Sequence, residues 1–233
     1  MALIELSKGR EEGGGYERLF GNQKLGHLLS RVQATVISSG TELEKIIGGL
    51  AQNIDNVDSF LKSQNLPSGT YLISKQAIKN SNLKSDKEPD LIVFKIDAVQ
   101  QHCYIIELKD GDTFDTKKAA GEVMLMEAFE NHLSKRIRFT TSIHVCSFNQ
   151  LDKKKIVVGF KNKITTEQAM TGKELCDLLG IDYASIIGSR IHQQIRNLDY
   201  FIDELLAIST IRETIIEKLK NPSFTQTNIL HTE

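Results

Sequence analysis

Residues 89–109 read PDLIVFKIDAVQQHCYIIELK, and this stretch decides the fold of the chain. Two apolar runs rich in β-branched and aromatic residues, 91–96 and 103–108, flank a short polar segment. This pattern predicts a β-hairpin. If its turn is centred between Ala98 and Val99, Asp90 faces Glu107 across the two strands, on the same face of the hairpin.

The same geometry predicts a cluster of charges at the open end of the hairpin. Side chains alternate between the two faces of a strand, so Lys109 points to the same side as Glu107. Two carboxylates on neighbouring strands repel each other, and both adjoin apolar runs where desolvation of a charge is costly. A hard divalent cation such as Mg²⁺ would relieve this repulsion, and the Lys109 amine could position or deprotonate a water there.

Pro89-Asp90, a spacer and then Glu107-Leu108-Lys109 resemble the signature of the PD-(D/E)XK nuclease superfamily, and the setting resembles that of type II restriction endonucleases. The resemblance covers about the central quarter of the chain. It implies that Asp90 and Glu107 are ligands of Mg²⁺, that the Leu108 carbonyl adds a ligand, and that Lys109 is the catalytic lysine that orients the attacking water.

Other triplets of the same kind occur at Asp115-Thr116-Lys117 and Asp152-Lys153-Lys154. Neither ends an apolar strand, and neither follows a Pro-Asp pair, of which the chain has one. The competing interpretation of 89–109 is a surface hairpin in which Glu107 and Lys109 lie at an edge and Asp90 has no role.

Two further acids are candidates for the same site. Some enzymes of the superfamily recruit an acid from an N-terminal helix, and Glu44 or Glu42 fits that description. The alternative for Glu44 is structural, because Thr41-Glu42-Leu43-Glu44 reads as a capping box that opens a helix after Gly40. Glu122 lies on the helix predicted from Asp112 or Thr113 to about Leu133, which could turn it toward the sheet.

Outside the hairpin, the pattern predicts helices, the hairpin, a helix, strands and then helices. Strands are predicted at 137–148 and 155–160, a short strand and a helical turn at 71–79, a capped helix at 171–180, and two helical pieces within 185–219. The fold class is therefore α/β, with a central mixed β-sheet flanked by helices, a restriction-endonuclease-like core and additional N- and C-terminal helices. We expect a single nuclease domain over 1–233, with its catalytic core at about 70–165 and a C-terminal helical region at about 166–220.

The charge distribution is uneven. The 233 residues have a formal net charge of -1, which argues mildly against a general nucleic-acid coat protein. Residues 131–163, however, contain eight Lys and Arg side chains and one acid. This is either a solvated face or a phosphate-binding surface. The DNA-contact candidates are Lys117, Lys118, Arg136, Arg138, Lys153, Lys154 and Lys155.

Several classes of protein are not indicated. The sequence has no apolar run long enough for a membrane span and no secretory signal pattern, so we expect a cytoplasmic protein without membrane contact. Three cysteines without CxxC spacing indicate reduced thiols rather than a disulfide frame or a zinc site. The absence of a P-loop and of GxGxxG argues against a nucleotide cofactor.

The first hypothesis is thus a Mg²⁺-dependent type II restriction enzyme that cuts double-stranded DNA at a specific sequence and leaves 5′-phosphates. A palindromic target would call for a homodimer. The alternatives are a repair or recombination nuclease with the same core, and a non-catalytic nucleic-acid-binding or protein-interaction domain.

Overall fold

The computed structural model describes residues 3–10, 14–99, 101–111 and 116–220. The chain forms two compact units, one of residues 1–39 and 188–233 and the other of residues 40–187. Two long helices, α2 (Gln23–Leu50) and α8 (Tyr183–Ala207), run through both units. Whether residues 1–233 act as one nuclease domain, with the boundaries expected above, stays a prediction.

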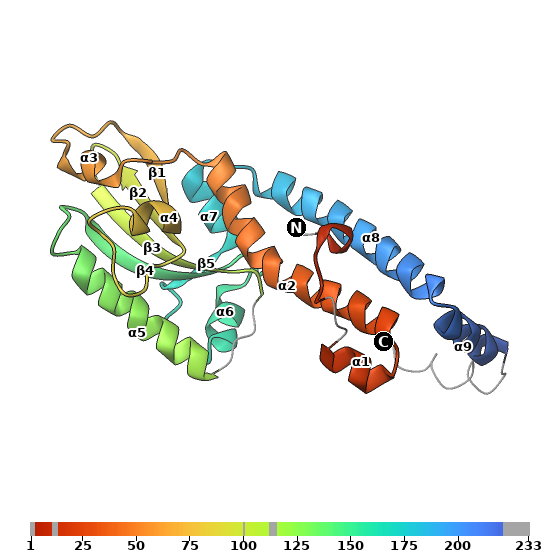
Figure 1. The fold of residues 1–233 in the computed structure, drawn as a ribbon. Helices are drawn as coiled ribbons and strands as arrows, with labels where there is room; N and C mark the ends of the chain where they lie inside the picture. The colour runs from red at the N-terminus through yellow and green to blue at the C-terminus, as the bar shows by residue number, and fades with distance from the viewer. Residues whose placement is uncertain (1–2, 11–13, 100, 112–115, 221–233) are drawn as a thin grey trace. The chain divides into compact units, whose positions relative to one another are not determined.

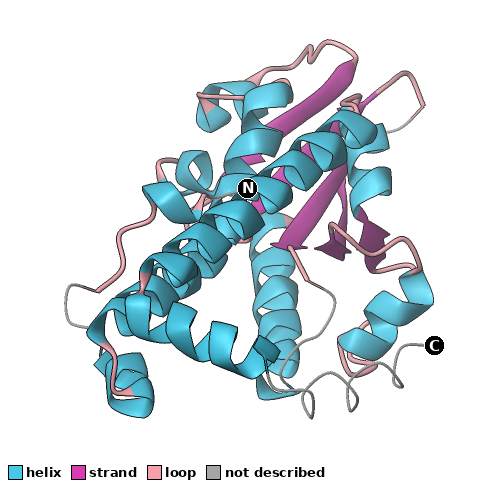
Figure 2. Ribbon diagram, turned by 90° about the vertical axis from the view of Figure 1, so that its right-hand side faces the viewer, coloured by secondary structure: helices cyan, strands magenta, loops and turns pink. Residues whose placement is uncertain are grey.

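The unit of residues 40–187 is built on a five-stranded mixed sheet (Figure 1). Its strands are β1 (Gly69–Ser74), β2 (Leu91–Ile96), β3 (Gln101–Lys109), β4 (Thr140–Ser147) and β5 (Ala169–Thr171), in that spatial order. Strands β1, β2 and β3 pair antiparallel, and β3, β4 and β5 pair parallel. Helices lie on both sides of the strands (Figure 2), so the predicted α/β class is confirmed.

The predicted hairpin and its register are also confirmed. Leu91 pairs with Ile106 and Ile92 with Ile105. Continuing this register by one residue beyond β2 places Asp90 opposite Glu107, as the constant pairing sum of an antiparallel ladder requires. The turn is closed locally, because the Asp97 carboxylate accepts a hydrogen bond of 2.8 Å from the Val99 N–H.

Each face of the sheet carries its own apolar core. On one face, strand residues such as Ile92, Phe94 and Ile105 pack against helices α3 (Val57–Lys62), α4 (Lys75–Lys79), α5 (Thr116–Leu133) and α6 (Lys153–Gly159). On the other face, Val93 and Ile106 pack against the second half of α2, helix α7 (Gly172–Leu179) and the first turn of α8. A sheet covered on both faces explains why 91–94 and 105–108 are continuous apolar runs interrupted only by Glu107.

One edge of the sheet collects chain segments that are distant in sequence. Because β3, β4 and β5 are parallel, their carboxyl ends lie together, with Lys109 beside Ser147 and Ser147 beside Thr171. Strand β2 runs the other way, so the residue before it, Asp90, lies at the same edge. The fold therefore gathers the predicted catalytic residues at one edge.

Two predicted elements are wrong. Residues 155–160 belong to helix α6, not to a strand: Asp152 caps the helix by accepting from the Lys154 N–H, and Ile156 and Phe160, one turn apart, are buried. Helix α2 does not end at Gly40, and Thr41 is no N-cap, because Leu43 and Ile47 pack one continuous helix onto the sheet and outweigh the weak helix propensity of glycine. A further element, strand β5, was not predicted, because three residues are too few to give an alternation in the sequence.

Other predicted elements are confirmed. The Thr171–Glu174 capping box forms with both of its hydrogen bonds. The segment 71–79 is a strand followed by a helical turn, and 185–219 is two helices, the end of α8 and α9 (Ser209–Lys220). The predicted starts of the central helix, Asp112 or Thr113, lie outside the described residues.

The unit of residues 1–39 and 188–233 is helical. It contains the 3₁₀ helix η1 (Ile4–Leu6), α1 (Gly14–Phe20), the first half of α2, most of α8, and α9. Arg31 joins three of these segments: it donates to the carbonyls of Ile4 and Ser7, at 2.8 and 3.1 Å, and to the hydroxyl of Tyr200 on α8. Within the described residues, no helix combines the length and apolar character that a membrane crossing requires.

A partly buried imidazole, that of His144, lies on β4, three residues before the carboxyl end of that strand. The Ser142 hydroxyl bonds to the Nε2 atoms of both His102 and His144, at 2.7 and 2.8 Å. Burial lowers the pKa of His144 to about 4, and the neighbouring His102 and Lys153 add to the shift. His144 is therefore neutral in the folded chain at neutral pH.

We expect this histidine to make the fold sensitive to acid. The folded pKa lies below the value of about 6.5 for an unfolded histidine, so the unfolded chain takes up the proton first as the pH falls. The contribution of neutral His144 to the free energy of unfolding is complete above about pH 6.5 and is lost as the pH falls toward 4. Between pH 7.5 and 5 the free energy of unfolding should fall by about 2 kcal/mol from this group. Urea unfolding at the two pH values should show this loss reduced in His144→Gln and unchanged in the exposed control His192→Gln; equal losses in all three proteins would contradict the assignment.

Gly172 provides a second test of the fold. A Cβ atom at this position would lie 2.2 Å from the Phe148 carbonyl oxygen, whereas at Gly40 in α2 it would meet nothing within 4 Å. Gly172→Ala must displace backbone between β4 and α7, so we expect it to lower the free energy of unfolding by about 3 kcal/mol. Gly40→Ala should leave stability equal or raise it by up to about 1 kcal/mol. Denaturant unfolding of both variants checks the close approach, which a harmless Gly172→Ala would refute.

Candidate active site

Two buried carboxylates lie side by side at the edge of the sheet. Asp90 precedes β2 and Glu107 lies on β3, and each has 7% of its surface exposed. Both are exceptions to the apolar composition of the hairpin. Acidic side chains are seldom buried unless other groups compensate their charge, so the contacts of these two residues define the site.

Asp90 is held by both of its carboxylate oxygens. Oδ2 accepts a hydrogen bond of 3.0 Å from the Leu108 N–H, and Oδ1 lies 2.9 Å from the Nζ of Lys75. Lys75 was not predicted. Its position follows from the pairing of β1 with β2. Ser74 at the end of β1 pairs with Leu91, so the next residue, Lys75, lies beside Asp90.

The Lys109 amine bridges two acids on different elements. Its Nζ lies 2.8 Å from Glu107 on the same strand and 3.0 Å from Glu122 on α5. Glu107 and Lys109 face α5 because they share the strand face of Ile105, which packs on that side. The structure thus brings Glu122 into the cluster of Asp90, Glu107 and Lys109.

The Leu108 carbonyl is directed toward the same place. The Lys109 carbonyl accepts from the Phe148 N–H on the β4 side, so the preceding carbonyl, that of Leu108, points to the β2 side. Pro89 is the residue opposite Leu108 in the register, and a proline has no N–H to donate to that carbonyl. The Pro-Asp pair therefore leaves a main-chain oxygen directed at the position of Asp90.

Glu44 on α2 also belongs to this environment. Burial raises the pKa of its carboxyl, the charge of Asp90 raises it further, and Lys75 opposes the shift. Glu44, Lys75 and Asp90 line one cleft of about 520 Å³. With the capping box at 41–44 absent, the structural alternative for Glu44 is removed.

The acids outnumber the bases in this cluster. Burial, followed by repulsion from Asp90, raises the pKa of Glu107, although Lys109 acts in the opposite direction. Burial lowers the pKa of Lys109, but Glu107 and Glu122 raise it more, so the amine is protonated. Lys75 is likewise protonated, because Asp90 outweighs the effect of burial. Two ammonium groups are thus set against the four acids Glu44, Asp90, Glu107 and Glu122.

These residues fit a hard divalent cation. Their ligands are carboxylate and carbonyl oxygens, the type that Mg²⁺ prefers, and a positive ion would offset the repulsion that raises the pKa of Glu44 and Glu107. Among the described residues, no group of three or more His, Cys, Asp or Glu side chains is arranged to hold a metal. The candidate ligands are the carboxylates of Asp90 and Glu107 and the Leu108 carbonyl, a small set that suits an ion that keeps several waters.

The turn after Lys109 is fixed by residues that were not predicted. The fully buried Ser147 donates from Oγ to the Gly111 carbonyl at 2.9 Å. Asn149 donates from Nδ2 to the carbonyl and the carboxylate of Asp110, at 2.7 and 2.9 Å. These contacts hold the end of β3, and with it the position of Lys109.

The basic candidates do not form one group. Arg136 and Arg138 precede β4 and donate to the carbonyls of Asn82 and Ser63, at 2.6 and 3.3 Å. Strand β4 pairs with β3 from His102 to Lys109, so these arginines lie about 23 Å from the acids, at the other end of the sheet. Their hydrogen bonds connect the segment before β4 to the segments that contain Asn82 and Ser63.

The remaining lysines lie nearer the acid cluster. Lys153 forms an ion pair of 3.2 Å with Glu174, just beyond the end of β5, and Lys154 and Lys155 are exposed on α6. Lys118 is exposed on α5. The side chain of Lys117 lies outside the described residues.

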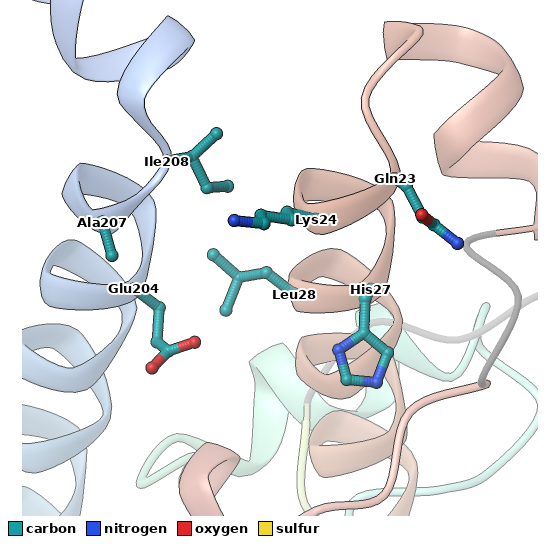
Figure 3. Close-up of a pocket in the computed structure, with 7 residues that line it drawn as sticks. All are labelled: Gln23, Lys24, His27, Leu28, Glu204, Ala207 and Ile208. Atoms are coloured by element: carbon teal, nitrogen blue, oxygen red, sulfur yellow. The ribbon is translucent and has the colours of Figure 1, made fainter.

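A separate cavity of about 530 Å³ lies within the helical unit. Figure 3 shows Lys24 and Leu28 extending from α2 toward Ala207, the last residue of α8, and Ile208, which follows it, with Glu204 one turn earlier on α8. The cavity combines scattered charges with apolar side chains and lacks a pair of adjacent carboxylates. The acid cluster at the sheet edge is therefore the better candidate for chemistry.

Comparison with known proteins gives one clear relationship. No family model matches the chain, and no solved structure gives a significant match. The type II restriction enzyme HhaII of Haemophilus parahaemolyticus is 42% identical over 224 residues, which cover 92% of this chain and 98% of that protein. The matched region includes the whole acid cluster and nearly all of both units. The chain therefore belongs to the type II restriction enzymes.

Proposed function

We propose that this protein is a Mg²⁺-dependent endonuclease that cuts double-stranded DNA at a specific sequence. The observation that carries the proposal is the meeting of Asp90, Glu107 and Lys109 at one sheet edge, in a chain that is 42% identical to a type II restriction enzyme. The same three residues, with Pro89 before them, support assignment to the PD-(D/E)XK superfamily. A cytoplasmic location agrees with three buried free thiols.

In this proposal the acids hold the cofactor. Asp90, Glu107 and the Leu108 carbonyl would bind Mg²⁺, which supplies a positive charge against the scissile phosphate and makes water more acidic. Glu44 and Glu122 lie close enough to the cluster to act as additional acids. The Leu108 N–H keeps the Asp90 carboxylate in one orientation, so its second oxygen faces Lys75 and the cleft.

Lys109 would orient the attacking water. Its amine is anchored between Glu107 and Glu122 and so has a defined position before DNA binds. The water attacks phosphorus, the bond from phosphorus to the 3′ oxygen breaks, and a 5′-phosphate and a 3′-hydroxyl result. Lys118 and the lysines 153–155 are the described side chains best placed to contact phosphates near this edge, whereas Arg136 and Arg138 are not.

The acid cluster predicts that cleavage depends on metal. A mapped plasmid incubated with the protein and Mg²⁺ should give discrete fragments, and EDTA should abolish them. The fragments should be joined by DNA ligase without prior kinase treatment, because the ends carry 5′-phosphates. A smear of products, or a preference for junctions or free ends, would instead indicate a repair or recombination nuclease.

Lys109→Ala tests the assigned mechanism. We expect it to slow cleavage by about 100-fold or more, since loss of the positioning of a reactant can cost that factor, and to leave DNA binding in place. Lys173→Ala is the matched control, because Lys173 also forms an ion pair with an acid, Asp177, but lies on the exposed surface of α7. Single-turnover cleavage rates and gel-shift affinities measure the two effects. Wild-type cleavage by Lys109→Ala would rule out the proposed role.

A further inference from the structure

Lys75 lies against one of the two carboxylate oxygens of Asp90. The Asp90 Oδ2 accepts from the Leu108 N–H at 3.0 Å, and Oδ1 lies 2.9 Å from the Lys75 Nζ. Each oxygen thus already has a partner, and one of these partners is a cation. A divalent cation held by Asp90 and the Lys75 ammonium would repel each other, because like charges a few ångströms apart interact strongly in a partly buried site. Lys75 therefore competes with a metal for this carboxylate.

The ammonium can move, whereas the carboxylate is fixed. The Lys75 side chain has 35% of its surface exposed, against 10% for that of Asp90. The backbone of Lys75 is held at the start of α4, because the Ser74 hydroxyl caps that helix by accepting from the Ala77 N–H at 3.3 Å. The ammonium lies at the end of a flexible four-carbon stem. Its Nζ can therefore leave Asp90 without a change in the fold.

The cleft of about 520 Å³ beside this ion pair gives the ammonium a second place to bind. Three lysines line it, Lys45 of α2 and Lys75 and Lys79 of α4. Lys45 and Lys79 are exposed. The acids that line it are Glu44 and Asp90, which belong to the acid cluster. When a cation offsets these two acids, the lysines leave the cleft positively charged, which suits a phosphate group.

We propose that Lys75 is a positioning residue with two successive partners. Before a metal binds, its ammonium compensates the charge of Asp90. When Asp90 holds a divalent cation, Lys75 leaves it for the cleft and binds a phosphate of the DNA there, beside Lys45 and Lys79. The inference rests on the proposed function for the identity of both ligands, and it goes beyond that function by coupling their binding through one side chain.

This exchange makes each ligand strengthen the binding of the other. DNA that holds Lys75 removes a positive charge from Asp90, so the metal binds more tightly. By reciprocity the metal strengthens DNA binding by the same factor. Without the Lys75 charge, metal affinity in the absence of DNA should rise, because the competing cation is gone. The strengthening of DNA binding by metal should fall, because the phosphate loses a partner.

Lys75→Gln tests the competition without DNA. Ca²⁺ is the probe, because it prefers the same oxygen ligands as Mg²⁺. In calorimetric titration of the full chain, we expect Lys75→Gln to bind Ca²⁺ about 10-fold more tightly than the wild type, a factor typical of coupled sites. Lys75→Arg keeps the charge and should match the wild type. Equal Ca²⁺ affinity in the wild type and Lys75→Gln, or no binding by either, would overturn the inference.

The matched control for the titration is Lys173→Gln. Lys173 also forms an ion pair with an acid, Asp177, but on the exposed surface of α7. Its Ca²⁺ affinity should equal that of the wild type. An equal rise in Lys173→Gln and Lys75→Gln would show a general effect of net charge and would contradict the specific competition at Asp90.

DNA binding tests the second partner. In gel shifts with a plasmid fragment, we expect Lys75→Gln to bind about 10-fold more weakly than the wild type in Ca²⁺ but equally in EDTA, because Asp90 holds Lys75 when no metal is bound. Lys79→Gln removes a cleft lysine one turn along α4 and should weaken binding in both conditions. A loss in Lys75→Gln that is the same with Ca²⁺ and with EDTA would refute the exchange.

Chemical labelling of the wild type tests the exchange without any variant. An N-hydroxysuccinimide ester modifies free amines, and mass spectrometry measures the rate at each lysine. Ca²⁺ should raise the rate at Lys75 several-fold, and DNA added with Ca²⁺ should lower it again, whereas the rate at Lys173 should stay constant. A rate at Lys75 that does not respond to Ca²⁺ would rule out its release from Asp90.

These measurements separate the inference from the nuclease proposal. The titration and the labelling in Ca²⁺ alone use no DNA, so tighter Ca²⁺ binding by Lys75→Gln supports the competition even if the protein cuts no DNA. Conversely, equal Ca²⁺ affinities would overturn the role of Lys75 while specific, metal-dependent cleavage by the wild type still stood.

Discussion

The repulsion between two buried carboxylates on adjacent strands is the constraint around which this structure is arranged. Asp90 and Glu107 are fixed opposite each other by the antiparallel register, and both lie where the apolar cores of the two sheet faces end. Every group that touches them reduces the cost of their charge. The Leu108 N–H and Lys75 do so for Asp90, and Lys109 does so for Glu107. The compensation is partial, because burial and Asp90 still raise the pKa of Glu107.

The register of the hairpin could be predicted because it follows from one number, the position of the turn. The position of the turn also makes Asp90, Glu107 and Lys109 neighbours, so their meeting follows from the sequence alone. Lys75 could not be predicted from the sequence, because its position beside Asp90 depends on the pairing of β1 with β2. The sequence does not show which strand lies next to the hairpin. Glu122 was a candidate because a helix must cover the apolar strand face, but its contact with Lys109 depends on the rotation of that helix.

The errors of the sequence prediction have a common cause. The segment 155–160 has β-branched residues, yet it forms helix α6 because Ile156 and Phe160 enter the core one turn apart. A helix was expected to open after Gly40, yet α2 runs through this position because Leu43 and Ile47 pack against the sheet. In both places tertiary packing overrides a local preference worth about 1 kcal/mol or less per residue. The Thr171–Glu174 box was predicted correctly because its hydrogen bonds are local and Gly180 ends the helix in a left-handed conformation.

Pro89 links the strand pairing to the site. A residue with an N–H at this position could bond to the Leu108 carbonyl and extend the β2–β3 ladder by one step. Proline cannot, so the ladder stops and the Leu108 carbonyl stays directed toward the acids. The Leu108 N–H donates to the Asp90 carboxylate. The buried ion pairs that result are weak contributors to stability, since replacing such pairs by apolar groups is often neutral or favourable. The stability of this unit therefore comes from the two apolar cores and not from the polar groups at the edge.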